Sequence, residues 1–166
     1  MINRYFAILG LIAAAIAVSP ARAAVVNGTA AKVPGYQARG ATEIAAVGPL
    51  APSLQGKPVV VRIHADWCPA CKATQSTIDH LRQAYAGKIN FVQFDVTNAK
   101  TAAASKALAQ KLGLEKFYDA SKAATSTIAV IDPQNGKVYA TFYNDSRNDE
   151  YHRAIDAALK GQKLIA

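Results

Sequence analysis

Cys68 and Cys71 are the residues of this chain whose type and spacing most directly suggest chemistry. They are its only two cysteines, and they lie between an apolar, strand-like run and a helix-like run. A Cys-x-x-Cys pair in that position is typical of a redox pair. Unpaired backbone N–H groups and the positive end of the dipole at a helix N-terminus stabilise a thiolate. The pattern therefore predicts that Cys68 attacks a disulfide of a partner and that Cys71, one helical turn later, resolves the mixed disulfide.

Three neighbours of the cysteines should shape this site. Trp67 is the only tryptophan of the chain, and we expect its ring to shield the sulfurs, with ordinary packing as the alternative. Pro69 removes one backbone N–H donor near the sulfurs, and Ala70 adds no donor from its side chain. Both residues are therefore expected to affect the reduction potential of the pair.

A metal site is the main alternative interpretation of the same stretch. His64 shortly precedes the pair, so His64, Cys68 and Cys71 would suit Cu(I) or zinc in a metal-binding or metal-delivery module. A structural zinc site normally has four ligands, however, and His64 is more simply a strand-end residue with a partly hydrated ring. A redox-silent protein-binding domain is a third and weaker alternative. Because the pair closes only a very short loop, it is a poor staple for distant segments, which favours catalysis.

The N-terminal residues predict an exported protein. Arg4 is followed by an apolar run over residues 5–18 and by a small-x-small pattern over residues 21–23. This order is typical of a signal peptide, here residues 1–23 with cleavage after Ala23. An uncleaved membrane anchor is the alternative, but the apolar run is shorter than the roughly 20 residues that span a membrane. We therefore expect a periplasmic location, and oxidising compartments suit a cysteine pair.

The length and composition favour one folded domain that does not bind nucleic acid. The chain has 166 residues, of which 51% are hydrophobic, enough for a core of its own. The formal net charge is +8, but no basic block interleaves with aromatic residues, which argues against nucleic acid as a partner. We expect an N-terminal arm over residues 24–56, in which residues 41–47 could form a short helix, and a folded domain over residues 57–166.

The pattern of apolar residues predicts an α/β fold. Strands are expected over residues 59–64, 89–96, 127–131 and 138–143, and helices over residues 68–85, 101–112 and 149–159. Two helical crossovers would give parallel strands, and the turn over residues 132–136 would make the last two strands an antiparallel hairpin. The predicted fold is therefore a mixed sheet with helices on both faces.

This order of elements, with the stretch ADWCPACK over residues 65–72 after the first core strand, resembles the thioredoxin superfamily. Together with residues 95–97 after the second core strand, the stretch is most similar to the C-terminal thioredoxin-like domain of DsbD-type bacterial disulfide reductases. The resemblance implies a thioredoxin-like fold, thiol–disulfide exchange with protein partners and no bound cofactor. A membrane protein that donates or accepts electrons by thiol–disulfide exchange would be one such partner.

Ser126 is the first departure from the pattern of that superfamily. Its members normally carry a cis-proline directly before the third core strand, facing the cysteines, and here Ser126 precedes Thr127 at that place. A cis bond before a residue other than proline costs ~2.5–4 kcal/mol, so we expect a trans bond or an altered loop. Because that loop usually binds the backbone of the partner, Ser126 and Thr127 are expected to affect substrate binding.

Arg62 is the second departure. Thioredoxins carry a buried Asp six residues before the first cysteine, where it assists proton transfer from the resolving thiol, and here that residue is Arg62. An arginine near Cys71 would favour the thiolate but cannot act as a base. The simpler alternative is a guanidinium that leaves for the sheet edge or pairs with a carboxylate such as Asp95.

An inserted segment is the third departure. Residues 115–125 come in addition to the expected elements, directly before the loop at Ser126. Two aromatic residues of this insertion, Phe117 and Tyr118, are expected either to cover the cysteines or to join the core.

Overall fold

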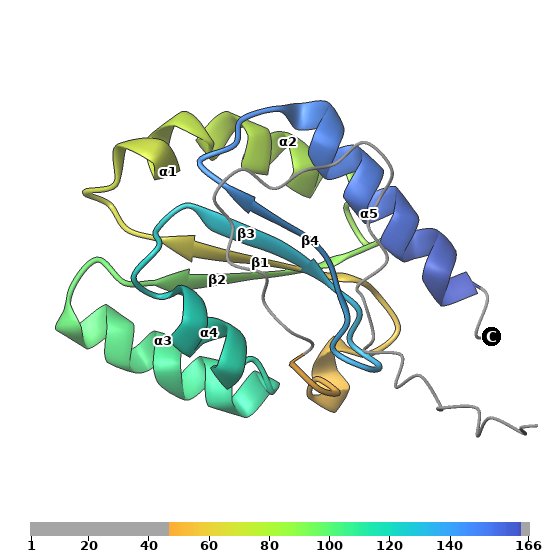
Figure 1. Ribbon diagram of the computed structural model, residues 1–166, viewed down its shortest axis with the longest axis horizontal. Helices are drawn as coiled ribbons and strands as arrows, with labels where there is room; N and C mark the ends of the chain where they lie inside the picture. The colour runs from red at the N-terminus through yellow and green to blue at the C-terminus, as the bar shows by residue number, and fades with distance from the viewer. Residues whose placement is uncertain (1–46, 164–166) are drawn as a thin grey trace, which may run out of the picture.

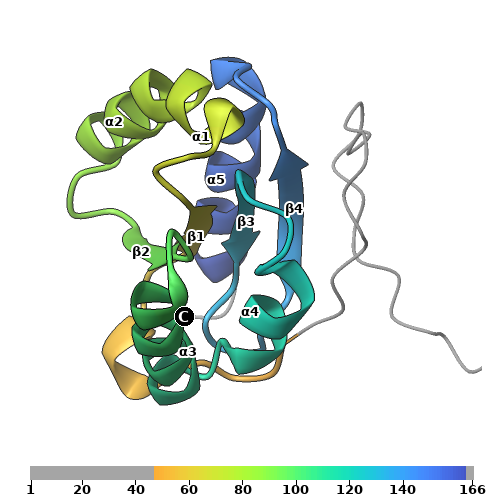
Figure 2. The same cartoon turned by 90° about the vertical axis from the view of Figure 1, so that its left-hand side faces the viewer.

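The computed structural model describes residues 47–163, which build a four-stranded sheet covered by helices on both faces (Figure 1). The strands are β1 (Val59–His64), β2 (Asn90–Asp95), β3 (Thr127–Ile131) and β4 (Val138–Tyr143). The helices are α1 (Pro69–Ala73), α2 (Gln75–Ala84), α3 (Ala99–Leu112), α4 (Glu115–Ser121) and α5 (Asn148–Lys163), with a 3-10 turn η1 (Pro52–Leu54) before β1. Helices α1, α2 and α5 cover one face, and α3 and α4 cover the other (Figure 2). The predicted α/β class with a mixed sheet is confirmed.

The sheet topology corrects one part of the prediction. The strand order is β2-β1-β3-β4. Strand β1 pairs with β2 in parallel and with β3 antiparallel, and β3 pairs with β4 antiparallel, as the predicted hairpin requires. The crossover from β1 to β2 is therefore parallel, whereas the expectation of a second parallel crossover, from β2 to β3, is wrong.

The inserted helix α4 explains the direction of β3. Helix α3 carries the chain from the carboxyl end of β2 to Gly113, which ends α3 in the left-handed region at φ +75° and lies beside Pro49 and Leu50. Helix α4 then brings the chain back across the sheet. Strand β3 starts next to the carboxyl end of β1, where the N–H of Ser126 donates to the carbonyl of Ile63 at 2.9 Å. One extra helix in the connection thus reverses the strand that follows it.

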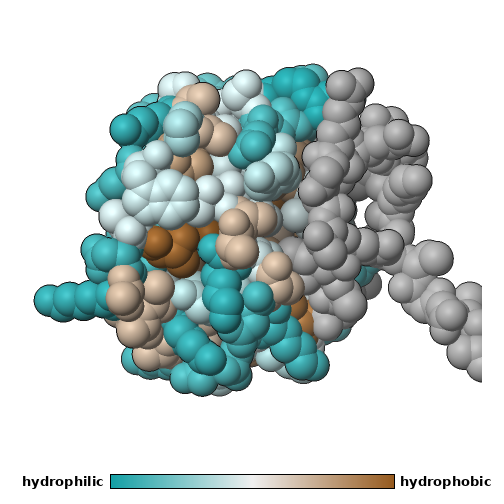
Figure 3. All heavy atoms as spheres, turned by 60° about the vertical axis from the view of Figure 1, so that its left-hand side comes forward, coloured by the Kyte–Doolittle hydropathy of each residue, from teal (hydrophilic) through white to brown (hydrophobic). Residues whose placement is uncertain are grey.

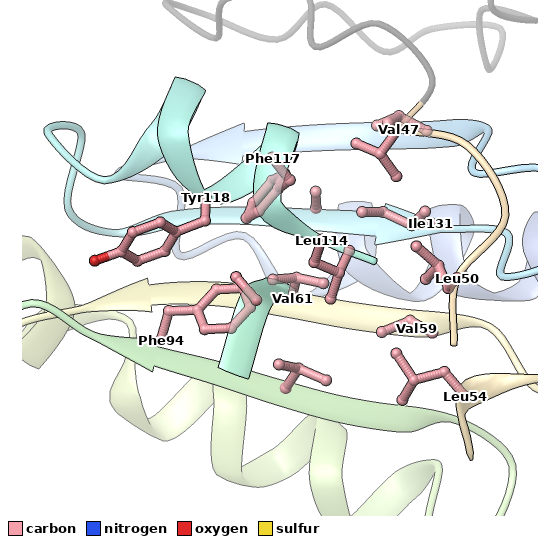
Figure 4. Packing of buried hydrophobic residues seen from close by; sticks show 14 of the residues in the cluster. Val47, Leu50, Leu54, Val59, Val61, Phe94, Leu114, Phe117, Tyr118 and Ile131 are labelled. Carbon is pink, nitrogen blue, oxygen red and sulfur yellow. The ribbon is translucent and has the colours of Figure 1, made fainter. Parts of the chain in front are cut away.

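Both aromatic residues of the insertion join the core on the α3–α4 face of the sheet (Figure 4). Phe117 and Tyr118 are buried against residues from β1, β2 and β3. The Tyr118 ring meets Phe94 edge-on, with 5.4 Å between centroids, and its hydroxyl donates to the carbonyl of Ala102 at 2.8 Å. Of the two alternatives for the insertion, the structure shows core packing.

The opposite face of the sheet packs against α2 and α5. Val60 of β1 belongs to an apolar cluster that includes Ile78 and Leu81 of α2 and Tyr151 of α5. Arg62 points to the same face, because side chains alternate along a strand, and it is fully buried there. Strand β1 therefore brings a charged side chain into an otherwise apolar layer.

The first described residues pack onto the domain. Val47, Leu50 and Leu54 are buried in the core on the α3–α4 face, and the N–H of Val47 donates to the carbonyl of Gly136 at 3.0 Å. The packed structure therefore begins before residue 57, inside the segment expected to be an arm.

The remaining N-terminal predictions concern other parts of the chain. The signal peptide over residues 1–23, the arm over residues 24–46 and the short helix up to residue 46 lie outside the described residues. Among the helices within residues 47–163, none is long and apolar enough to cross a membrane.

The helix predicted over residues 68–85 is broken at Thr74 into α1 and α2. The hydroxyl of Thr74 donates to the carbonyls of Ala70 at 3.0 Å and Cys71 at 3.2 Å. Such side-chain bonds to the preceding turn often bend a helix. The carbonyl of Cys71 therefore lies at a break, where it accepts hydrogen bonds from side chains.

Candidate active site

The two cysteines lie at the start of α1, where the sequence predicts them. Cys68 is the N-cap residue of α1, and its sulfur accepts a hydrogen bond from the backbone N–H of Cys71 at 3.0 Å. Pro69 takes the first position of the helix, where its missing N–H has no partner to lose. Both cysteines are free thiols in the structure. The cap geometry thus brings the second cysteine back onto the first.

The environments of the two sulfurs separate their pKa values. Burial raises the pKa of the Cys68 thiol, but hydrogen bonds from the Cys71 thiol, the Thr125 side chain and the N–H groups of Cys71 and Ala70 outweigh it, so the pKa lies below its ordinary value. Burial, followed by the hydrogen bond to Cys68, raises the pKa of the Cys71 thiol. Cys68 keeps 3% of its surface exposed and Cys71 none. The attacking cysteine needs the lower pKa and the greater exposure of the two, and Cys68 has both. The roles of Cys68 in attack and of Cys71 in resolution stay predictions.

Trp67 stands out from the surface beside the cysteines. Its side chain is 60% exposed, and its indole N–H donates to the carbonyl of Thr97 at 2.9 Å. The Thr97 hydroxyl in turn accepts from the N–H of Asp66 at 3.0 Å. Ordinary core packing does not describe so exposed a ring. In Figure 3, which turns this end of the molecule forward, a small apolar area lies between paler and hydrophilic side chains.

The loop before β3 has the altered geometry that the sequence predicts. Within residues 47–163 no peptide bond is cis, and Ser126 has a φ of +69°, in the left-handed region that is uncommon for residues other than glycine. Its N–H donates to the carbonyl of Ile63 at 2.9 Å, which ties the loop to the end of β1. Thr127 closes the turn, because its hydroxyl donates to the carbonyl of Ala124 at 2.6 Å.

Thr125 is a site residue that sequence reasoning missed. Hydrogen bonding by its side chain is one of the causes that hold the pKa of the Cys68 thiol below its ordinary value. The sequence analysis singled out the two residues that follow it, Ser126 and Thr127. A signal was present, since a hydroxyl residue in a loop expected to face the cysteines is a candidate donor to a thiolate.

Arg62 lies directly beneath the second cysteine. Its Nη2 donates to the carbonyl of Cys71 at 2.7 Å, and its Nη1 donates to the amide oxygen of Gln75 at 2.8 Å. The alternative in which the guanidinium leaves for the sheet edge or pairs with Asp95 is therefore wrong. Asp95 instead accepts from the N–H of Thr97 at 2.7 Å. Arg62 stays inside because the break after α1 offers it an acceptor.

His64 is engaged with a neighbouring acid. Its Nε2 lies 3.1 Å from a carboxylate oxygen of Asp66. In the part of the chain that the structure describes, no three side chains of His, Cys, Asp or Glu are grouped so that they could hold a metal ion. The metal-binding alternative with His64, Cys68 and Cys71 is therefore not favoured, and His64 fits a partly hydrated strand-end residue.

Comparisons with known proteins point to one superfamily. The thioredoxin family model matches residues 51–127. A thiol:disulfide interchange protein TxlA homolog of Synechocystis sp. is 40% identical over 53 residues, which are 31% of this chain and 29% of that protein. The chloroplastic thioredoxin-like protein HCF164 of Arabidopsis thaliana is 42% identical over 45 residues, 27% of this chain and 17% of that protein. Thioredoxin C-2 of Corynebacterium nephridii is 41% identical over 46 residues, 28% of this chain and 43% of that protein.

The alignments cover less than half of each of these relatives. Among solved structures, Fasciola hepatica thioredoxin aligns with a TM-score of 0.45 and 21% identity, covering 64% of this chain and 85% of that chain. Mitochondrial thioredoxin 3 of Saccharomyces cerevisiae aligns with a TM-score of 0.42 and 21% identity, covering 63% and 81%. Residues 51–127, which include the Cys-x-x-Cys pair at the start of α1, are therefore similar to the thioredoxin family.

Proposed function

We propose that this protein is an exported thiol–disulfide oxidoreductase that exchanges disulfides with protein partners. The observation that carries the proposal is the cap of α1, where the N–H of Cys71 donates to the Cys68 sulfur at 3.0 Å. The pKa of Cys68 below its ordinary value supplies the thiolate that attacks a disulfide. The relatives named as thiol:disulfide interchange proteins and thioredoxin support the same activity.

The exchange runs in two displacements. The Cys68 thiolate attacks one sulfur of the partner's disulfide, and the partner's S–S bond breaks as a mixed disulfide forms and the other partner sulfur leaves as a thiolate. Cys71 then loses its proton and attacks the Cys68 sulfur. The mixed disulfide breaks, the second partner thiol is released, and a Cys68–Cys71 disulfide remains. Two electrons have passed from the cysteine pair to the partner, which is now reduced. The same two displacements in reverse order transfer the disulfide to a partner and oxidise it.

The loop before β3 is the part of the molecule that we assign to partner binding. Thr125 helps to lower the pKa of the Cys68 thiol, and Ser126 and Thr127 follow it along the chain into β3. Trp67 is exposed, precedes Cys68 in the chain and is held by a hydrogen bond to the carbonyl of Thr97, which follows β2. We assign these residues to partner binding, with the chemistry left to the two cysteines.

The place of the reaction is part of the proposal. Residues 1–23 have the pattern of a cleaved signal peptide, which supports a periplasmic protein. The similarity of residues 65–72 to the C-terminal domain of DsbD-type reductases supports a membrane electron donor or acceptor as one of the partners. N-terminal sequencing of the protein from a periplasmic fraction should give a chain that starts at Ala24. A full-length chain retained in the membrane would contradict this part.

Turnover of insulin by dithiothreitol tests the activity. The full chain should accelerate insulin reduction at neutral pH, and Cys68→Ser should reduce the rate to that of dithiothreitol alone. Cys71→Ser should still attack but not resolve, so it should accumulate a mixed disulfide with the substrate, visible on a non-reducing gel. Ser76→Ala, at an exposed position of α2, is the matched control. No acceleration by the wild-type protein with both thiols free would end the proposal.

A further inference from the structure

Arg62 is a buried cation without a carboxylate partner among residues 47–163. Its side chain is fully buried, and its two hydrogen-bond acceptors, the Cys71 carbonyl and the Gln75 amide oxygen, are neutral. Its Nε is buried with no hydrogen-bond partner. Burial lowers the pKa of the guanidinium, but arginine stays protonated in proteins. Because a buried charge is costly unless it is paired, a balancing anion is expected close by.

Among the groups whose charge acts on Arg62, the two thiols are the ones that can become anions. One carboxylate, Asp79, is linked to Arg62 through Gln75, whose Nε2 donates to it at 3.0 Å, and its charge is the same in both redox states. In setting the pKa of Arg62, the attraction of Cys71 and then of Cys68 opposes the effect of burial. Arg82 of α2 also acts on Arg62, but it is another cation, and Asp79 lies 3.9 Å from Arg82 on the exposed side of that helix. Thiolates exist only in the reduced pair, since the sulfurs of a disulfide carry no charge. The attraction to Arg62 therefore stabilises the reduced state alone.

We propose that Arg62 is a positioning residue whose charge biases the Cys68–Cys71 pair towards its reduced form and so raises its reduction potential. The inference rests on the proposed function, because it gives that site its redox tendency. In the half-reaction the disulfide takes up two electrons and one proton. The S–S bond breaks to give a Cys68 thiolate and a Cys71 thiol. The charge of Arg62 stabilises the thiolate of the reduced pair, whereas it has no charge to attract in the disulfide.

The same charge favours the resolving step. Cys71 must lose its proton before it attacks the mixed disulfide, and burial holds the pKa of this thiol above its ordinary value while Arg62 opposes that rise. The bond from Nη2 to the Cys71 carbonyl keeps the cation at the break between α1 and α2. Arg62 thus favours the thiolate without taking the proton, which passes to the leaving thiolate of the partner.

A glutathione equilibrium measures this bias. In it, the protein disulfide and two glutathione molecules give the reduced protein and glutathione disulfide, and the reduced fraction of the full chain is read by alkylation and mass spectrometry. Arg62→Met removes the charge at similar side-chain length, and it should shift the equilibrium at least about ten-fold towards the protein disulfide, or about 30 mV. Arg62→Lys keeps the charge and should stay within about three-fold of the wild type.

A second pair of variants tests the charge while Arg62 stays in place. Gln75→Glu puts a carboxylate where an amide oxygen now accepts from Nη1, so it should shift the equilibrium in the same direction by at least about three-fold. Ser76→Glu adds the same charge at the exposed neighbouring position of α2 and should leave the equilibrium unchanged. This comparison decides the question even if Arg62→Met does not fold.

Three results would overturn the inference. One is an unchanged equilibrium in Arg62→Met, and another is an equal shift in Arg62→Met and Arg62→Lys, which would assign the effect to hydrogen-bond geometry. The third is an equal effect of Gln75→Glu and Ser76→Glu. Failure of the proposed function looks different, because the wild-type pair would then form no disulfide in glutathione buffer or would exchange none with insulin.

Discussion

The end of β1 beside the cysteines and the core under α3 and α4 differ in how well their polar groups are satisfied. Five buried side-chain atoms of the described residues lack a hydrogen-bond partner, and three of them, Arg62 Nε, His64 Nδ1 and Ser126 Oγ, belong to β1 or to the loop tied to its end. The α3–α4 side has one, Ser121 Oγ. On that side a capping box satisfies the backbone N–H groups at the start of α3, because the side chains of Asn98 and Thr101 each accept a hydrogen bond from the backbone N–H of the other.

This difference separates stability from reactivity. Incompletely paired polar groups and strained backbone persist where the surrounding structure holds them, and they concentrate at functional sites. The α3–α4 side supplies one of the two apolar clusters that hold the fold, while the end of β1 holds a cation and a left-handed serine near the two thiols. Changes in the first region should therefore affect unfolding, and changes in the second should affect redox behaviour.

The largest effect is expected in the α3–α4 core. Phe117→Ala should lower the free energy of unfolding by about 3–5 kcal/mol, because it removes a fully buried ring and leaves a cavity. Urea denaturation measures this loss. The glutathione equilibrium of the folded variant should equal that of the wild type. If Phe117→Ala shifted the glutathione equilibrium as much as Arg62→Met does, the two regions would not differ in function in the way we infer.

The two thiols should differ in reactivity. Because the pKa of Cys68 is lowered and that of Cys71 is raised, iodoacetamide at pH 7 should modify Cys68 at least about ten-fold faster. The rate at Cys68 should rise with pH and level off below the range of an ordinary thiol. Peptide mass spectrometry after timed quenching gives both rates. Equal rates at the two sites would contradict the assigned order of attack.

Arg62→Met should leave the oxidised protein as stable as the wild type or make it about 1 kcal/mol more stable. The physical reason is that replacing a buried charge by an apolar side chain of similar volume is often neutral or stabilising. Urea denaturation of the disulfide form is the measurement, and Arg62→Lys is the control. A loss comparable to that of Phe117→Ala would mean that Arg62 is a structural residue of the sheet.

The smallest effect is expected at Ser126. Ser126→Gly relieves the cost of a left-handed residue and removes a buried hydroxyl without a partner, but glycine loses more chain entropy on folding. The net result should be a gain of about 0.5 kcal/mol in the free energy of unfolding. The matched control, Ser76→Gly in α2, should lose stability instead. A loss at Ser126 as well would show that the strain assigned to this loop is absent.

Much of the fold could be predicted from the sequence because local patterns determine it. The hairpin of β3 and β4 has the predicted bounds, since alternating apolar residues flank a strong turn signal. The direction of β3 could not be predicted, because it depends on α4, a short helix without a side-chain cap. The break at Thr74 could not be predicted either, because the hydroxyl of this one residue interrupts a helical pattern of apolar residues that is otherwise continuous over residues 68–85.

The site was predictable where its chemistry is local. The cysteines and their place at the start of α1 follow from the stretch around them, and the trans bond at Ser126 follows from the cost of the alternative. Of the two alternatives for Arg62, the one near Cys71 is what the structure shows. The other, a guanidinium that leaves for the sheet edge, had been the simpler expectation because charged side chains are almost never fully buried without a partner. Thr125 was missed although it is a hydroxyl residue in the loop expected to face the cysteines, because its effect on Cys68 depends on how the tertiary structure brings that loop to α1.

The exposed ring of Trp67 makes the molecule its own optical reporter. The chain contains one indole, it is adjacent in sequence to Cys68, and its N–H donates to the carbonyl of Thr97. Fluorescence excited at the indole band therefore comes from a single residue, which precedes the cysteine pair in the chain. We expect oxidation and reduction of the pair to change this emission, so that the reaction can be followed in real time without attaching a dye.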